Sequence, residues 1–146
     1  MTDRVTLEVF LDDSLYACCG TDLVVGGQVA WPLNFELGEK PDASQLTGVL
    51  EQPAPTSEGV PDGLCFHVGA ALFYVSDESL RRGEVTLTGR ALYINHGYVP
   101  LEWPLTTGTV RRIRSTGGRF HHRWTSSDSH RVWGGQDTRV TVQLEQ

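Results

Sequence analysis

Two residues that could bind a metal ion stand two positions apart in a segment that alternates like a β-strand. The segment Leu64–Val68 reads Leu-Cys-Phe-His-Val, and the two-residue period of a strand places Cys65 and His67 on one face. A thiolate and an imidazole nitrogen are both zinc ligands, but a site needs further donors, for which Cys18 or Cys19 with a distant histidine are the candidates. None of the usual zinc spacings is present, so a metal-binding protein ranks as our third hypothesis, and we expect no cofactor.

A second set of candidates lies in the C-terminal part of the chain, where arginines alternate with aromatic residues. Guanidinium groups pair with phosphates and aromatic rings stack on bases, so this pattern could form a nucleic-acid or anionic-ligand site. The candidate residues are Arg111, Arg112, Arg114, Arg119, Arg123, Phe120 and Trp124.

The strand that carries the first of these arginines breaks the two-residue period. Val110 and Ile113 are three positions apart and cannot both face inward on a regular strand. A β-bulge at Arg111-Arg112 would reconcile them and would turn two guanidinium groups toward the same region. Bulges occur beside binding sites and at ordinary barrel corners, and we favour the structural explanation here.

Charge is distributed unevenly between the two parts of the chain. Residues 1–80 hold thirteen acids against Arg4 and Lys40, a balance of −11, and residues 81–146 hold ten arginines against five acids, a balance of +5. A net charge of −6 repels a polyanion at long range. We therefore favour arginines that pair with carboxylates across the fold over a nucleic-acid site.

The sequence contains no arrangement of residues typical of a catalytic site. It has no G-x-S-x-G nucleophile turn, no phosphate-binding loop with its lysine and no G-x-G-x-x-G turn. A cysteine with a histidine elsewhere arises by chance in any chain with three Cys and five His. We name no catalytic residue and favour a protein that is not an enzyme.

Length and composition indicate one globular domain spanning residues 1–146. The chain has 146 residues, 39% of them hydrophobic and 21% charged, which is ordinary for a folded domain. Its longest apolar stretches, around residues 69–75, are far shorter than the roughly 18 to 20 residues that span a bilayer. The first residues, Met-Thr-Asp-Arg-Val-Thr, lack the order of a secretory signal, so we expect a cytoplasmic protein that keeps its cysteines as thiols.

Alternation of apolar and polar residues predicts an all-β fold. Strands are expected at residues 5–11, 29–35, 64–75 with a break or bend near Gly69, 84–95 with a bend or close approach at Gly89, 106–115, 119–125 and 138–144. Pro32 has no amide hydrogen, which indicates an edge or a bulge in the second strand. This pattern is typical of a small antiparallel barrel, SH3-like or OB-like, or of a sandwich.

Two short helices and a flexible loop complete the expected fold. Asp42 as N-cap with Gln45 three residues later predicts a helix over 42–50, although Gly48 weakens it. Ser76, the acids after it and the terminating Gly83 predict a helix of one or two turns. Prolines at 53, 55 and 61 indicate a flexible surface loop over 52–63.

One stretch of the chain resembles a known family. Cys18-Cys19-Gly20-x-x-Leu23-x-Val25-Gly26-x-x-Val29-x-Trp31 is similar to the N-terminal motif of an uncharacterised family of small bacterial proteins. The resemblance implies that these two cysteines and the tryptophan belong to a recurring element. It implies no activity.

We interpret the sequence as a non-enzymatic β-barrel or sandwich that mediates protein–protein interaction or homo-oligomerisation. Four tryptophans, four tyrosines and eleven arginines supply the residue types from which interface anchors are drawn. Burial of Trp103, Trp124 and Trp133 in the core would remove that argument. A protein partner is favoured over nucleic acid, and no membrane partner is expected.

Overall fold

A computed structural model describes residues 6–11, 22–39, 43–93, 99–116, 129–131 and 139–146. These residues form eleven strands and no helix, which confirms the all-β class. None of them forms a helix with the length and hydropathy needed to cross a membrane. In chain order the strands are β1 (Thr6–Leu11), β2 (Asp22–Val24), β3 (Gln28–Trp31), β4 (Leu33–Leu37), β5 (Ser44–Glu51), β6 (Leu64–Val68), β7 (Ala71–Val75), β8 (Gly83–Tyr93), β9 (Thr106–Thr116), β10 (Ser129–Arg131) and β11 (Arg139–Glu145).

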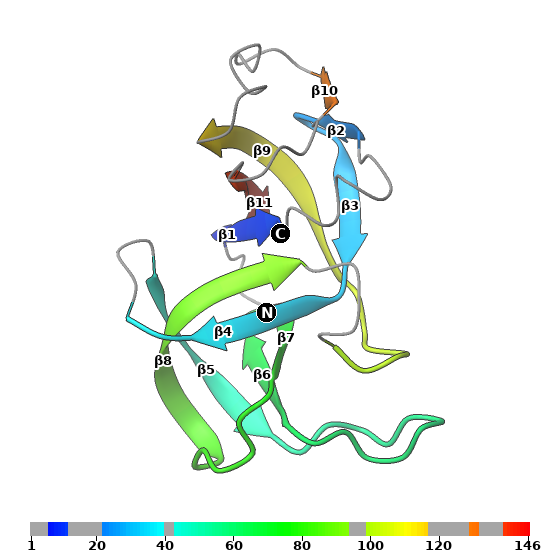
Figure 1. The fold of residues 1–146 in the computed structure, drawn as a ribbon, viewed down its shortest axis with the longest axis vertical. Coiled ribbons are helices and arrows are strands. Elements are labelled where there is room, and N and C mark those ends of the chain that lie inside the picture. Colours follow the sequence, from blue (N-terminus) through cyan, green and yellow to red (C-terminus); the bar gives the residue numbers. More distant parts are fainter. Residues whose placement is uncertain (1–5, 12–21, 40–42, 94–98, 117–128, 132–138) are drawn as a thin grey trace.

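Five of the strands close into a barrel. The sheet order β8-β4-β7-β6-β5 is completed by pairing of β5 with β8, so that the barrel has no open edge. The barrel is small, as predicted, but one of its pairings, β4 with β7, is parallel. Figure 1 shows the long β8 curving around it. Its first half pairs with β5 and its second half with β4.

Two glycines allow the barrel strands to come this close. A Cβ at Gly89 would overlap the backbone carbonyl of Glu36, and a Cβ at Gly48 would overlap that of His67. The close approach predicted at Gly89 is therefore confirmed.

The remaining strands extend the sheet from one edge of β8. β1 lies parallel to β8, followed by β11, β9 and β3, while β2 and β10 form a separate pair. The strand predicted over 29–35 is divided at Pro32: β3 before it pairs with β9, and β4 after it belongs to the barrel. The edge position that Pro32 indicated holds for β3, the terminal strand in the described part of the sheet, but not for β4, which pairs with both β7 and β8.

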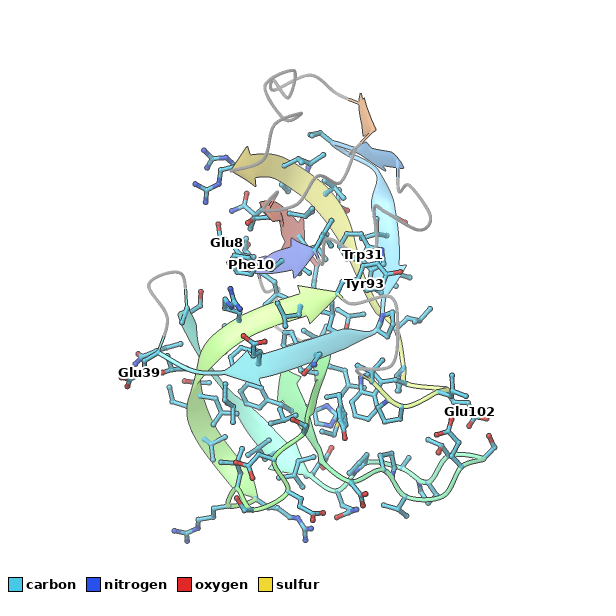
Figure 2. All side chains as sticks on the ribbon, viewed as in Figure 1. Glu8, Phe10, Trp31, Glu39, Tyr93 and Glu102 are labelled. Atoms are coloured by element: carbon cyan, nitrogen blue, oxygen red, sulfur yellow. The ribbon has the colours of Figure 1, made fainter. Side chains whose placement is uncertain are left out.

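A continuous apolar core runs from the barrel into this extension. Phe35, Phe66 and Phe73 meet inside the barrel with ring centroids 5.6 to 6.2 Å apart. In the extension, Trp31 stacks on Tyr93 at 4.8 Å (Figure 2). The alternation predicted for the first strand is confirmed, because β1 buries its Leu7, Val9 and Leu11.

Both predicted helices are wrong. Residues 44–51 form β5, because their pairing with β8 over seven positions outweighs the local capping residues at 42 and 45. Residues 76–82 form turns, in which the Ser79 amide donates to Asp77 Oδ1 at 3.0 Å. This is a local turn around an aspartate and not the start of a helix. The strand predicted over 119–125 lies outside the described residues.

Candidate binding site

The outer face of the barrel strands β5, β6 and β7 carries the candidate site. Phe66 points into the barrel, so the alternation of β6 turns Cys65 and His67 outward together, as predicted. Antiparallel registers then place Glu51 of β5 on one side of Cys65 and Tyr74 of β7 on the other.

A loop between β8 and β9 covers this face. Trp103 packs edge-on against the Tyr74 ring at a centroid distance of 5.4 Å, and the two form a small outer cluster with Cys65. The loop is anchored where it enters β9, since the Leu72 amide donates to Thr106 Oγ1 at 3.0 Å. Trp103 is therefore buried, though outside the barrel core, whereas Trp124 and Trp133 lie outside the described residues.

A second loop, between β5 and β6, meets the first. The Ser57 amide donates to Glu102 Oε2 at 3.0 Å, and the Ser57 hydroxyl donates to the other carboxylate oxygen. These two hydrogen bonds lower the pKa of Glu102. Figure 2 shows Glu102 pointing from the upper loop toward the lower one. We call residues 52–63 and 99–105 together the two-loop face.

The backbone on both sides of this contact is specially shaped. Glu102 has a φ of 67°, a left-handed conformation that is uncommon for a residue with a side chain. Thr56 and Gly59 form a small bridge that holds the tip of the lower loop. The flexibility that the prolines of this loop indicated stays a prediction.

The two-loop face contains two hollows. The smaller, of about 430 Å³, lies over the outer face of β6 and is lined mainly by Trp103, Leu72 and three prolines, with Glu51, Glu102, Cys65 and His67 as its ionisable groups. The larger, of about 640 Å³, is more open and is lined among others by Val60, Tyr74 and Leu101. Volumes of this order are typical of small-ligand and side-chain pockets.

Three of the four ionisable groups of the smaller hollow, Glu51, Cys65 and His67, meet at a single atom of His67. Its Nε2 lies 3.4 Å from Cys65 Sγ and also pairs with Glu51 Oε1. A nucleophilic cysteine would use one ring nitrogen as base and the other to hold an orienting carboxylate. Here both partners share the same nitrogen.

The thiol is also in the wrong protonation state for catalysis. Burial, with the Glu51 carboxylate as a second cause, raises the pKa of the Cys65 thiol to about 12. Since the thiolate is the reactive and metal-binding form, this cysteine is a neutral side chain at physiological pH. Among the described residues no group of three or more His, Cys, Asp or Glu is arranged to hold a metal ion. Cys18 and Cys19, the other proposed ligands, lie outside them.

One polar group in the wall of the smaller hollow has no partner. The indole N–H of Trp103 is buried and finds no acceptor among the described residues. A buried donor without an acceptor is destabilising.

The arginine-rich strand is organised as a bulge with ion pairs. In the pairing of β9 with β11, Gln143 faces Arg112 and Leu144 faces Val110, so Arg111 is the extra residue and the predicted bulge is confirmed. Arg111 Nε lies 3.1 Å from a Glu145 carboxylate oxygen.

Arg114 pairs in the same way with Glu8 of β1 at 2.7 Å, and Arg90 pairs with Glu36 at 2.7 Å. These contacts fit the expectation that arginines neutralise carboxylates across the fold. The remaining candidates of the arginine site, Arg119, Phe120, Arg123 and Trp124, lie outside the described residues, so that site stays a hypothesis.

Three residues of the smaller hollow were not predicted from the sequence to belong together. Glu51 enters through the register of β5 on β6, and Glu102 and Trp103 enter through the path of a loop. The only local sign was that Trp103 is flanked by an acid and a proline in a segment without strand alternation.

The fold and the site define a small closed β-barrel protein with a loop-covered pocket on its outer surface. The chain belongs to a family described as a family of unknown function, DUF6578, whose model matches residues 5–146. The predicted membership in an uncharacterised family is confirmed, and it extends over almost the whole chain; the bacterial origin and the cysteine-glycine motif stay predictions. No curated protein and no solved structure matches the chain.

Proposed function

We propose that this protein is a non-enzymatic binding module that recognises an extended, basic and apolar segment of a partner protein at the two-loop face. One observation carries the proposal: exposed apolar side chains and carboxylates gather on the two-loop face. Val60 and Leu101, which are 54 and 71% exposed, line the larger hollow together with Glu58 and Asp62. Leu105, 57% exposed, ends the same loop as Leu101 but lines neither hollow. Exposed apolar side chains beside a pocket are typical of an interaction site.

The charges of this face select the chemistry of the partner. Residues 43–80 and 91–110 contain no Lys or Arg, and they supply Glu51, Glu58, Asp62 and Glu102 around the hollows. A basic segment complements this potential and is attracted to it during association.

The same charges argue against homo-oligomerisation through this face. A twofold interface brings the same surface patch of both copies together, so the carboxylates of one copy would oppose those of the other. Of the two forms of association that the sequence suggested, we therefore propose a different protein as the partner. A cytoplasmic location, where Cys65 stays a thiol, goes with this proposal.

Selection of short displayed peptides on the immobilised protein at low salt tests the proposal. Enriched peptides should combine Arg or Lys with aliphatic or aromatic residues, and their binding should weaken as salt is added. Leu101→Ser should reduce their affinity by about tenfold, since a central apolar contact contributes on the order of 1–2 kcal/mol.

Val49→Ser is the matched control, because it removes an exposed aliphatic side chain that lies on β5 and lines neither hollow. It should leave the affinity unchanged. If no peptide is enriched, or if the two variants lose the same affinity, the two-loop face is not the binding site.

A further inference from the structure

We infer that the smaller hollow is a pocket for one arginine side chain of the partner segment; this inference rests on the proposed function and names the residue type that the pocket selects. The hollow joins an apolar wall, an indole ring and two carboxylates. Arginine combines an apolar stem with a planar cation, and so matches all three.

The apolar wall of the hollow can pack against the methylene groups of an arginine side chain. Leu72, Pro53, Pro55 and Pro104 line the hollow with carbon atoms, which favour the methylene groups of a long side chain over water. Trp103 lines the same space, and the face of an indole attracts a guanidinium group more strongly than any other aromatic side chain does.

The two carboxylates of the hollow can accept hydrogen bonds from the guanidinium group. Each Glu102 oxygen accepts one hydrogen bond from Ser57, which leaves acceptor sites on both oxygens. Glu51 pairs with His67 through Oε1. Its Oε2 has no partner among the described residues. A guanidinium presents five N–H donors in a plane, enough for more than one carboxylate, whereas the ammonium of lysine is a more strongly hydrated point charge.

The floor of the pocket is formed by a neutral thiol and by the imidazole that holds Glu51. Cys65 is neutral, and His67 already lies against Glu51, so the carboxylate is held in place before a ligand arrives.

Peptides enriched on the wild-type protein provide the test. Replacing each basic position in turn by citrulline, which keeps the shape of arginine without its charge, should identify one position where affinity falls by about tenfold or more. Lysine at that position should lose most of the same affinity. For each of the variants Glu51→Gln and Glu102→Gln, the affinities of the arginine and citrulline peptides should differ by about threefold or less, because a charged acceptor has been removed.

Glu39→Gln is the matched control, since it removes an exposed carboxylate on the opposite side of the barrel (Figure 2) and should preserve the full arginine preference. Circular dichroism of each variant verifies its fold. If peptides bind at the two-loop face but no citrulline position couples to Glu51 or Glu102, the arginine pocket is wrong and the binding module stands. If no peptide binds, both proposals are wrong.

Discussion

The two faces of β6 and β7 are both covered, but by different means. On the inner face Leu64, Phe66 and Phe73 are enclosed by the other barrel strands and are fully buried. On the outer face Cys65 and Tyr74 are covered by Trp103 of a single loop, which leaves two hollows beside it. The closed face contains no ionisable group among these residues, while the loop-covered face gathers a thiol, an imidazole and carboxylates. The inner face stabilises the barrel, and the outer one leaves open space beside its cover.

The largest effect is expected from a truncation on the inner face. Phe73→Ala should lower the free energy of unfolding by about 3–5 kcal/mol, because the closed barrel cannot collapse around the cavity left by the ring. Urea denaturation followed by circular dichroism measures it. Tyr74→Ala, one residue along and on the outer face, should cost distinctly less; an equal cost would mean that the outer cluster is as much a part of the core as the barrel interior.

The pH dependence of Cys65 alkylation tests how well the outer face is covered. The thiol pKa is raised to about 12 in the fold and is 9.0 for the free group, so the folded protein holds less thiolate at every pH below about 12. Near pH 8 that difference makes alkylation of Cys65 about a thousandfold slower in the folded than in the unfolded chain.

Peptide mapping after iodoacetamide treatment isolates Cys65 from the other two cysteines. Its labelling rate in the native protein should keep rising above about pH 9, where that of the unfolded chain levels off. A native rate that levels off at the same pH as the unfolded rate would contradict the burial of this thiol.

Removal of the covering ring should have an intermediate effect. Trp103→Ala should cost about 1–3 kcal/mol of unfolding free energy, less than the barrel truncation, because the loop can settle onto the exposed strand. The same variant should speed the alkylation of Cys65 by exposing it to water. Loss of stability without faster alkylation would place the indole elsewhere than over the thiol.

The smallest effect is expected at the contact between the two loops. Ser57→Ala removes the hydroxyl hydrogen bond to Glu102 and keeps the one from the backbone amide, so the pKa of Glu102 should rise part of the way toward its ordinary value while the stability of the barrel hardly changes. An NMR titration of the Glu102 carboxyl carbon in both proteins measures the shift. An unchanged pKa would show that the Ser57 hydroxyl does not hold Glu102 in solution.

The same contrast explains what could be predicted from the sequence. Strand alternation placed Leu7, Val9 and Leu11 on a buried face and Cys65 beside His67, because a period of two is a local property of the chain. The bulge at Arg111 was predictable for the same reason, since a break in that period has few structural explanations.

The features that were not predicted depend on contacts between distant parts of the chain. Residues 44–51 carry a helix-capping pattern, and only their pairing with β8, some forty residues away, makes them a strand. Glu51 joins Cys65 through strand register, and Trp103 arrives by a loop whose position is set at Thr106. A single sequence contains no direct record of such pairings.

The order of strands along the chain has a consequence for how the protein is made. All five strands of the barrel lie between Leu33 and Tyr93, in one continuous stretch of the chain. β1, in contrast, pairs along one of its edges with β11, which comes more than 120 residues later (Figure 1). During synthesis, which adds about 5–20 residues per second, the barrel strands are all available before β9 and β11 have left the ribosome. β1 can then join the finished barrel along β8, and its other edge stays open until β11 emerges.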